Sequence, residues 1–231
     1  ICVRNLYKIY RVGETKVRAL DGVDFEIYKG EFVAIVGTSG SGKSTLLNML
    51  AGLEKPTKGE IEIGRVHIEK MTEKQLVTFR RERVGFIFQA YNLLNTMNAV
   101  ENVALPLSFR GMSKRERLKR AKKFMDLVGV GDQAKHMPNQ MSGGQQQRVG
   151  IARALVVSPE IIFADEPTGN LDPNNSWEIM KLLEEINESG TTVVVVTHNR
   201  EIVNAMQKRV ITMKKGVIIS DEEKGGYIDE D

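Results

Sequence analysis

The sequence predicts an α/β fold with parallel strand–helix–strand units and a long helical insertion. Two β-branched runs, "EIIFADEP" and "TTVVVVTHN", flank a helical pattern, and this order is typical of parallel β-α-β units. A short apolar run between glycines, residues 31–37, precedes a helical segment over 43–51 and indicates a buried strand. From about residue 90 to residue 157 the pattern is helical, with few strand signals.

The elements before the insertion read mainly as strands. Residues 3–9 and 17–27 read as strands separated by a turn at Gly13. Residues 84–88, "VGFIF", predict another buried strand. We expect one domain over 1–231, with an α/β core and β region in 1–89 and 158–231 and a helical subdomain in 90–157.

The insertion contains one clearly marked helix. Ser113 and Glu116 form the capping-box pattern S-x-x-E. Gly129 marks the end of the helix. Between them, apolar residues follow at helical spacing: Leu118, Ala121, Met125 and Val128.

After the insertion, the sequence predicts a helix, a hairpin and a tail. Asp172 is a plausible N-cap and Pro173 the first residue of the helix between the two β-branched runs, and Trp177, Met180 and Leu183 recur on it at core spacing. "VITMKKGVIIS" predicts a hairpin that turns at Lys215 and Gly216. The acidic tail "DEEKGGYIDED" lacks a core pattern and is expected to fray.

Composition places the chain among ordinary globular proteins. It has 231 residues, 41% hydrophobic and 27% charged. Its net charge of +3 is small and argues neither for nor against a nucleic-acid partner. Cys2 is the only cysteine, so an intrachain disulfide is impossible and a reducing compartment is expected. No apolar run approaches the roughly 18 residues that span a bilayer, and no signal peptide is seen. We expect a cytoplasmic protein that reaches a membrane only through a partner.

The sequence "GTSGSGKST", residues 37–45, matches the phosphate-loop pattern G-x-x-x-x-G-K-[ST] between a predicted strand and a predicted helix. Glycines let the backbone wrap an anion, and the helix N-terminus points N–H groups at it. Lys43 is expected to reach the β- and γ-phosphates, Ser44 to ligate Mg²⁺ and Thr45 to reach the α-phosphate. The candidate phosphate-binding residues are Gly37, Ser39, Gly40, Ser41, Gly42, Lys43, Ser44 and Thr45.

Two carboxylates follow a buried strand further along the chain. Asp165 ends the apolar run "IIFA", at the carboxyl end of a strand where open α/β sheets bind ligands, and is expected to hold the Mg²⁺ shell. Glu166 can orient or polarise an attacking water. Together with the phosphate loop, these residues indicate a nucleoside triphosphatase.

A second glycine motif identifies the kind of triphosphatase. "MSGGQQQR", residues 141–148, resembles the LSGGQ signature of ATP-binding cassette (ABC) proteins, with Met141 in place of the first leucine. It lies between the phosphate loop and Asp165, in the order of that family, and "FQAYNLL", "GNLD" and "VVVVTHN" match its Q-loop, D-loop and switch-histidine motifs. The resemblance covers essentially the whole chain and implies a RecA-like P-loop core with an antiparallel β region and an inserted helical subdomain.

The resemblance implies residue roles and a dimer. Gln89 would sense Mg²⁺ and the γ-phosphate, His198 would contact the γ-phosphate, and Tyr10 would stack on adenine. Two subunits would pack head to tail, so that each ATP lies between one phosphate loop and the signature of the other subunit. Asp172 would pack across that interface, and the signature residues that meet the nucleotide would be Ser142, Gly143, Gly144 and Gln145.

Other function classes remain as alternatives. A cassette ATPase of DNA repair would carry a long coiled coil between the phosphate loop and Asp165, and no sustained heptads are present. Translation-type cassette proteins carry two cassettes per chain, whereas this chain has one set of motifs. A small-molecule kinase or GTPase would not need the signature, and the NKxD guanine motif is absent.

Within transporters, "FIFQAYNLLNTMNAVENVALPL" and "DEPTGNLD" resemble a subgroup of macrolide exporters, lipoprotein-release systems, antimicrobial-peptide resistance systems and the cell-division ATPase FtsE. The resemblance implies a homodimer in the ATP-bound state, peripheral on the cytoplasmic face of the membrane, that drives a permease on another chain. "NNSWEIMKLLEEIN" looks more like the cell-division branch and "VGETKVRALDGVDF" more like the exporters, so the cargo stays open.

Two weaker signals have ordinary explanations. The basic segment 113–123 is interpreted first as a solvated helix face and second as a contact for anionic lipid headgroups. Nucleic acid is the third interpretation, because no aromatic residues interleave the charges of the segment. His67 and His136 have no second ligand at metal spacing and are expected on the surface.

Overall fold

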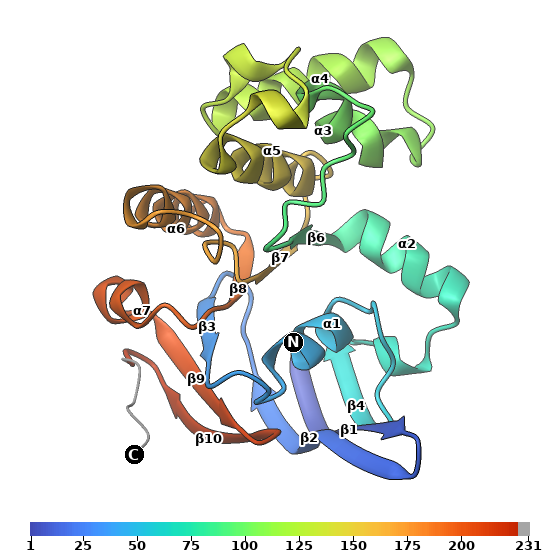
Figure 1. Ribbon diagram of the computed structural model, residues 1–231. Coiled ribbons are helices and arrows are strands. Elements are labelled where there is room, and N and C mark those ends of the chain that lie inside the picture. The colour runs from blue at the N-terminus through green and yellow to red at the C-terminus, as the bar shows by residue number, and fades with distance from the viewer. Residues whose placement is uncertain (226–231) are drawn as a thin grey trace. The chain divides into compact units, whose positions relative to one another are not determined.

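The structure, a computed structural model, describes residues 1–225 and divides into two compact units (Figure 1). Unit 1 combines Ile1–Thr78 with the chain from Thr192 onward, and unit 2 is Phe79–Thr191. The first boundary falls inside α2 (Glu73–Arg83). None of the helices in residues 1–225 is long and apolar enough to cross a membrane.

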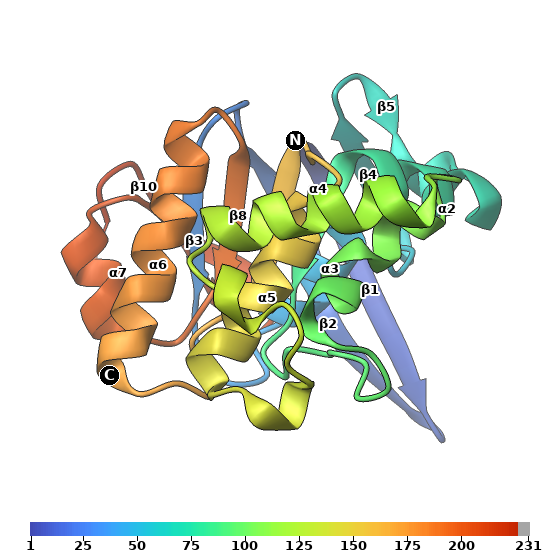
Figure 2. The same ribbon diagram turned by 90° about the horizontal axis from the view of Figure 1, so that it is seen from above.

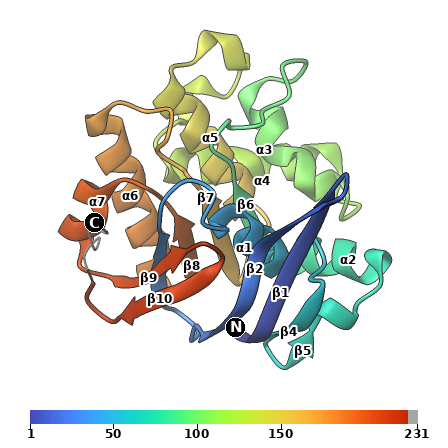
Figure 3. The same cartoon turned by 60° about the horizontal axis from the view of Figure 1, so that its bottom comes forward.

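Unit 1 holds most of the strands, and Figure 3 shows the antiparallel strands β2, β1 and β4 side by side. One sheet has the order β2-β1-β4-β5. Its strands are β1 (Cys2–Val12), β2 (Thr15–Glu26), β4 (Lys58–Ile63) and β5 (Val66–His67). The predicted N-terminal antiparallel β region is therefore present, and it includes two strands, β4 and β5, that the sequence pattern did not indicate.

The second group of strands in unit 1 surrounds the predicted buried run. Here β3 pairs in parallel with β8 on one side and with β9 on the other, and β10 pairs antiparallel with β9. Every residue of β3 and β8 is buried, as expected for parallel strands covered on both faces. The members are β3 (Phe32–Val36), β8 (Thr192–Val196), β9 (Arg209–Lys214) and β10 (Val217–Glu222).

Three helical segments of unit 1 join these strands. α1 (Lys43–Leu50) follows β3 and contacts β8, and a 3₁₀ turn, η1 (Ile68–Lys70), follows β5. α7 (Arg200–Met206) covers part of the parallel sheet, since its Val203 lies in a buried cluster with Ala34, Val36 and Val210. The apolar face of α7 thus completes the core of unit 1.

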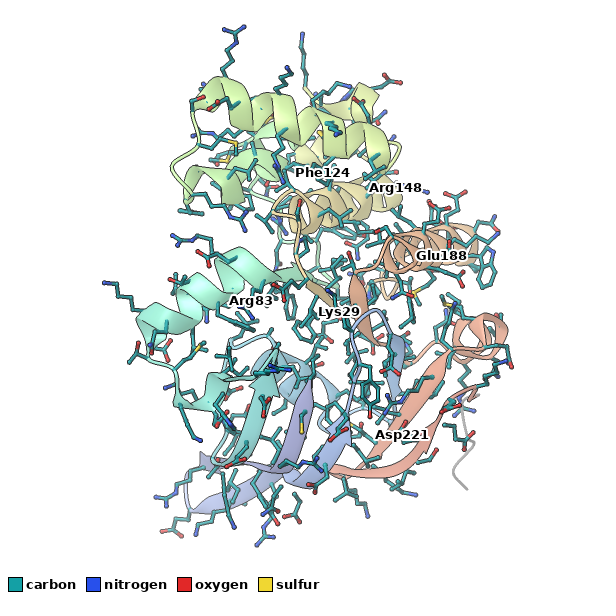
Figure 4. All side chains as sticks on the ribbon, turned by 180° about the vertical axis from the view of Figure 1, so that it is seen from behind. Lys29, Arg83, Phe124, Arg148, Glu188 and Asp221 are labelled. Atoms are coloured by element: carbon teal, nitrogen blue, oxygen red, sulfur yellow. The ribbon has the colours of Figure 1, made fainter. Side chains whose placement is uncertain are left out.

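The C-terminal hairpin turns where the sequence predicts. Lys215 and Gly216 both have positive φ, 47° and 81°, as in the tight turns that favour two-residue hairpins. The predicted fraying is wrong at the start of the acidic tail, because Asp221 lies in β10 (labelled in Figure 4) and accepts two 2.8 Å hydrogen bonds from Arg209. Residues 226–231 of that tail lie outside the described residues.

Unit 2 consists of two parallel strands and a set of helices. Figure 2 shows α4 lying across α5 and beside α3, and all three helices contact one another. The strands are β6 (Val84–Ile87) and β7 (Ile161–Asp165). The helices are α3 (Ala99–Ser108), α4 (Lys114–Leu127), α5 (Gly143–Leu155) and α6 (Pro173–Glu188), with 3₁₀ turns η2 (Gly131–Gln133) and η3 (Pro138–Gln140).

The helix ends of unit 2 follow the sequence signals with one difference. Asp172 caps α6 and Pro173 is its first residue, as predicted, and Gly129 follows α4 with φ 77°. Ser113 caps α4 by accepting the Glu116 N–H, but the Glu116 carboxylate accepts from the Ser113 hydroxyl instead of the Ser113 N–H. The predicted capping box is therefore only half formed.

Arginines bind the carbonyl groups at several helix ends in unit 2. Arg110 donates to the carbonyls of Arg81, at the end of α2, and of Val157, just beyond α5. Arg81 donates to the carbonyl of Phe109, which caps α3. Unpaired C-terminal carbonyls carry partial negative charge, so these cations stabilise the ends they contact.

Two predicted positions on the α6 core face are fully buried, and one is not. Met180 is 1% exposed and Leu183 0% exposed. Trp177 is only partly buried, with the Lys181 ammonium 5.3 Å from its ring centroid. The prediction of Trp177 as a core residue is wrong, because the indole keeps part of its surface exposed and pairs with a cation.

Candidate functional site

The predicted site residues fall into two sets, one in each unit. Unit 1 contains the phosphate loop, Tyr10 and His198, and unit 2 contains Gln89, the signature, Asp165, Glu166 and Asp172.

The phosphate loop connects the buried strand β3 to α1, as predicted. Gly37 and Gly42 have φ of 147° and 98°, a region that L side chains rarely adopt. A Cβ at Gly37 would overlap the Met213 carbonyl oxygen, and one at Gly42 would overlap the Ala19 carbonyl oxygen. Glycine is therefore required at both positions by the neighbouring backbone, whatever the loop binds.

The start of α1 is suited to an anion. Its N-cap, Gly42, supplies no side-chain hydrogen bond to the first N–H groups of the helix. Such N–H groups and the helix dipole favour negative charge. Ser39, Gly40 and Ser44 are exposed on the loop and the first turn, whereas Ser41 is buried and 2% exposed.

Lys43 is buried at 7% exposure and lies inside the loop that it follows. Its Nζ donates to the carbonyls of Gly37 at 2.8 Å and Thr38 at 2.9 Å, and to Ser41 Oγ at 3.4 Å. A buried ammonium needs such partners, and the loop carbonyls supply them. The geometry places a positive charge at the centre of the phosphate loop.

Tyr10 belongs to a small polar network beside α1. Its hydroxyl donates to Glu54 Oε2 at 2.7 Å, and Glu54 Oε1 lies 2.7 Å from Lys8 Nζ, which sits 5.1 Å from the Tyr10 ring centroid. Burial and the bond to Glu54 raise the pKa of Tyr10. Burial alone would raise the pKa of Glu54, but the hydrogen bonds from Lys8 and Tyr10 bring it below its ordinary value. The ring is thus held by its hydroxyl, with a cation over one face.

His198 lies in the loop that follows β8, which begins at the same edge of the unit 1 sheet as the phosphate loop. Ile35 of β3 pairs with Val196 of β8 in parallel register, and each strand runs directly into its loop. The Thr197 N–H donates to the Ile35 carbonyl, and Thr197 Oγ1 accepts from Asn199 N. His198 is exposed between them. Parallel strands therefore bring the switch-histidine loop and the phosphate loop to one edge.

Parallel pairing of β6 and β7 also brings the loop of Gln89 to the sheet edge where Asp165 and Glu166 lie in unit 2. Ile87 of β6 pairs in parallel with Ala164 of β7, so both loops begin at one sheet edge. A Cβ added to Gly169 would lie 2.6 Å from Gln89 Nε2, and Asn170 Nδ2 donates to the Gln89 carbonyl at 3.0 Å. The exposed Gln89 therefore packs on the turn that follows Glu166.

Glu166 has an uncommon backbone conformation. Its φ is 48°, in the left-handed region, and its carbonyl accepts a 3.0 Å hydrogen bond from Gly169 N. Left-handed non-glycine residues cluster at functional sites, where the surrounding structure holds the strain. Pro167 and Thr168, which follow it, are buried and fix the turn.

The signature residues open α5. Ser142 accepts from Gln145 N at 3.3 Å, and the Gln145 side chain accepts from Ser142 N at 2.9 Å, which forms a complete capping box. A Cβ at Gly143 would lie 2.8 Å from Tyr91 Oη, and one at Gly144 would overlap the Asn175 side-chain oxygen. The two glycines therefore admit close neighbours from the Q-loop and from α6.

Asp172 is exposed and organises the start of α6. It accepts from the Asn174 and Asn175 N–H groups and from the Asn175 side chain. The hydrogen bonds from Asn175 lower the pKa of Asp172. Since Asn175 also adjoins Gly144, the D-loop and the signature share a contact.

Sequence reasoning missed two polar residues of α5, the buried Gln147 and the half-buried Arg153. Gln147 is 0% exposed and donates to the carbonyls of Pro167 and Phe88, while Arg153 donates to the carbonyls of Tyr91 and Asn92. Both bind loop backbone, for which the sequence carries no pattern. Burial lowers the pKa of Arg153.

The two histidines without a predicted role differ in environment. His67 is half-buried, with Nδ1 3.0 Å from Glu69 Oε1, whereas His136 is exposed. In the basic segment, Arg120 Nε donates to the Val156 carbonyl at 2.8 Å, so part of that charge serves the end of α5.

Comparison with known proteins gives a consistent result. The family model described as "ABC transporter" matches residues 20–169. The chain is 48% identical to the cell division ATP-binding protein FtsE of Bacillus subtilis over 97% of both chains. It is 47% identical to the macrolide export ATP-binding/permease protein MacB of Chlorobaculum tepidum, matching 95% of this chain and 34% of that protein.

A solved structure is also similar. It is a dimeric ATP-binding cassette in a post-hydrolysis state bound to ADP and Pi, with a TM-score of 0.90 and 44% identity over 98% of this chain and 99% of that one.

Proposed function

The chain belongs to the ATP-binding cassette transporter family and is an ATP-hydrolysing nucleotide-binding subunit, and we propose that it works as a head-to-tail dimer with a separate membrane permease. The observation that carries the proposal is the β3–α1 loop. This loop is suited to a triphosphate in three ways. Its glycines allow the backbone to curve around an anion, the first N–H groups of α1 have no side-chain cap, and the Lys43 ammonium is buried inside it.

In unit 1, we assign the residues of the phosphate loop to the phosphates of ATP. Lys43 would exchange its bonds to the Gly37 and Thr38 carbonyls for the β- and γ-phosphate oxygens. Thr45 would reach the α-phosphate. Tyr10, held by Glu54, would offer a fixed ring face to adenine.

The available oxygen ligands fit Mg²⁺, a hard cation that prefers them. Ser44 is exposed on the first turn of α1, Gln89 is exposed beyond β6, and Asp165 ends β7. These three residues would hold the ion, which neutralises charge on the phosphates when bound.

Glu166 and His198 would carry the hydrolytic step. Glu166 accepts the proton of a water as its oxygen attacks the γ-phosphorus, the bond to the β–γ bridging oxygen breaks, and ADP and phosphate leave. His198 would position the γ-phosphate and the water. The strained turn at Glu166 supports this role, since it holds the carboxylate on a defined backbone.

The signature would meet the nucleotide of the second subunit. Ser142, Gly143, Gly144 and Gln145 begin a helix of thirteen residues, α5, whose dipole and first N–H groups favour an anion. Asp172 would lie across the same interface. The structural relative that is a dimer with ADP and Pi supports this arrangement.

Dimer formation with MgATP tests the arrangement. Glu166→Gln should slow ATP hydrolysis at least about 100-fold, because the general base is lost, and should leave nucleotide binding intact. MgATP should then shift the protein from monomer to dimer in size-exclusion chromatography with light scattering. The matched control, Glu160→Gln, replaces an exposed glutamate next to β7 and should hydrolyse ATP normally. A Glu166→Gln protein that binds MgATP and stays monomeric would contradict the dimer.

The membrane partner is inferred from relatives. The macrolide relative, of which this chain matches 34%, is named as an ATP-binding part and a permease in one protein. We place this chain on the cytoplasmic face of the membrane, bound to a permease. Identities of 48% to FtsE and 47% to MacB do not separate a cell-division role from an export role.

Co-purification with the permease encoded nearest in the genome tests this partner and its class. Recovery of a stoichiometric complex supports the membrane role, and ATPase activity with no permease bound under any condition would favour a cassette ATPase that works without one. Restoring division in a strain that lacks its cell-division cassette would favour the FtsE-like role over export.

A further inference from the structure

The signature helix α5 is tied to both catalytic loops of unit 2 by one buried amide. Gln147 is 0% exposed, and its Nε2 donates to the Pro167 carbonyl at 2.6 Å and lies 3.4 Å from the Phe88 carbonyl, also as a donor. Phe88 directly precedes Gln89, and Pro167 directly follows Glu166. One side chain therefore holds the backbone one residue from each of two proposed catalytic residues.

Only a hydrogen-bond donor can make these contacts. Both partners are carbonyl oxygens, so the amide oxygen of Gln147 cannot take the place of its nitrogen. That oxygen has no hydrogen-bond partner among residues 1–225. Position 147 thus keeps a buried amide whose oxygen makes no hydrogen bond, which lowers the stability of the fold. An apolar side chain of similar size would fill the same space without that cost.

Arg153 strengthens the same connection six residues later on α5. It donates to the carbonyls of Asn92 at 2.6 Å and Tyr91 at 2.8 Å. Tyr91 and Asn92 have φ of 59° and 51°, two consecutive left-handed residues that need outside support. The segment after Gln89 is therefore anchored to α5 as firmly as the residue before it.

The two loops also contact each other. Gln89 packs on Gly169, and its carbonyl accepts from Asn170. With Gln147 on one side and this contact on the other, the Gln89 loop, the Glu166 loop and α5 form a closed set of contacts within unit 2. A displacement of α5 is then transmitted to both loops, because packed elements move together.

We propose that Gln147 is a positioning residue for ATP hydrolysis, which couples the signature helix to Gln89 and Glu166 through the carbonyls of Phe88 and Pro167. Contact of the signature with the second subunit's nucleotide would move or fix α5, and Gln147 would pass that change to the hydrolytic groups. This inference rests on the proposed function of Gln89, Glu166 and the signature.

The test compares two variants with a neighbouring control. Gln147→Glu keeps the shape and removes the donor, and Gln147→Met removes both polar ends on an unbranched chain. The control, Gln146→Met, changes the adjacent glutamine, whose Nε2 donates to the Met141 carbonyl just before its own helix. For each protein, kcat and KM for ATP are measured, together with the stoichiometry of binding of a fluorescent ATP analogue.

Both Gln147 variants should lose at least about tenfold in kcat, because a small displacement of hydrolytic groups has a large effect on rate. Their KM and their binding stoichiometry should stay within about twofold of wild type, since the phosphate loop is in unit 1. Gln146→Met should keep kcat within about twofold.

Three results have distinct meanings. If the wild-type protein neither binds nor hydrolyses ATP, the proposed function fails. If wild type hydrolyses ATP and either Gln147 variant retains kcat, the positioning role is refuted. If both variants lose binding stoichiometry in proportion to kcat, Gln147 only stabilises the fold, and the positioning role is again refuted.

Discussion

Two glycines of the phosphate loop should respond differently to the same added methyl group. At Gly37, the Cβ of alanine would overlap the Met213 carbonyl oxygen and lie 2.8 Å from Ser41 Oγ, with φ at 147°. At Gly40, φ is 77° and no heavy atom lies within 4 Å of the added Cβ. Gly40→Ala therefore introduces backbone strain alone. Gly37→Ala introduces backbone strain and also a steric overlap of its Cβ with the Met213 carbonyl oxygen.

The magnitudes follow from these environments. Left-handed strain costs about 1–2 kcal/mol in either variant. A backbone carbonyl cannot rotate away, so the overlap at Gly37 adds about 1–3 kcal/mol, as overpacking does. The reduced freedom of the unfolded chain is the same for both variants and cancels. At about 2–4 °C per kcal/mol for a chain of this size, the Tm of Gly37→Ala should lie about 2–12 °C below that of Gly40→Ala.

Thermal unfolding without nucleotide, followed by circular dichroism, measures this difference. Equal Tm values for Gly37→Ala and Gly40→Ala would show that the Met213 backbone does not set the space at Gly37. Binding of an ATP analogue to the folded variants gives a second reading. Gly40→Ala should still bind, with reduced affinity, if the loop backbone is preserved.

Three further predictions concern other contacts. The pKa of Glu54 is lowered in the folded protein, so the stability that its carboxylate supplies is present above its unfolded pKa of 4.5 and is lost as pH falls through the folded pKa. The difference in Tm between wild type and Glu54→Gln should therefore be present at neutral pH and disappear in acid. A difference that persists in acid would contradict the ion pair with Lys8. Arg110→Gln should lower the free energy of unfolding by about 1–3 kcal/mol in denaturant titrations, because the carbonyls of two helix ends lose a charged donor. Arg110 and Arg115 are both exposed, so the control Arg115→Gln, on the first turn of α4, removes the same charge and should change the free energy of unfolding by under about 0.5 kcal/mol. Ser142→Arg should abolish most ATPase activity and leave nucleotide binding by the monomer intact, and an equal loss of monomer binding would indicate misfolding instead.

Local signals in the sequence were sufficient for much of this fold. Asp172–Pro173 and Lys215–Gly216 determine a helix start and a turn by their own backbone preferences, and both are confirmed. The α/β class is confirmed by the parallel pairs β3–β8 and β6–β7. The roles of the site residues stay predictions.

Two other elements were not predicted. α2 is strongly polar and basic, so it carries no apolar stripe that would mark a helix. β4 does alternate charged and apolar residues, but the alternating stretch is short and the sequence analysis did not use it. β4 is completed by pairing with β1, a partner far away in the sequence. Tertiary pairing of this kind is invisible to a reading of neighbouring residues.

The candidate site also combines residues that local sequence patterns reveal with residues whose roles appear only in the folded chain. The phosphate loop is recognisable because each residue type serves the anion directly. Gln147 and Arg153 donate to the backbone of distant loops. Every residue type has the same backbone carbonyl, so the sequence carries no pattern for these contacts. The packing of Gly143 on Tyr91 and of Gly144 on Asn175 also depends on the folded chain.

A mixing experiment tests the central claim, a hydrolytic site shared by two copies, most directly. Lys43→Ala disables the phosphate loop and keeps the signature, and Ser142→Arg does the reverse, so each protein alone should be inactive. In an equal mixture, half of the dimers are mixed and each contains one intact pair of loop and signature, which predicts recovery of about a quarter of wild-type activity. A mixture as inactive as its components would contradict the shared site.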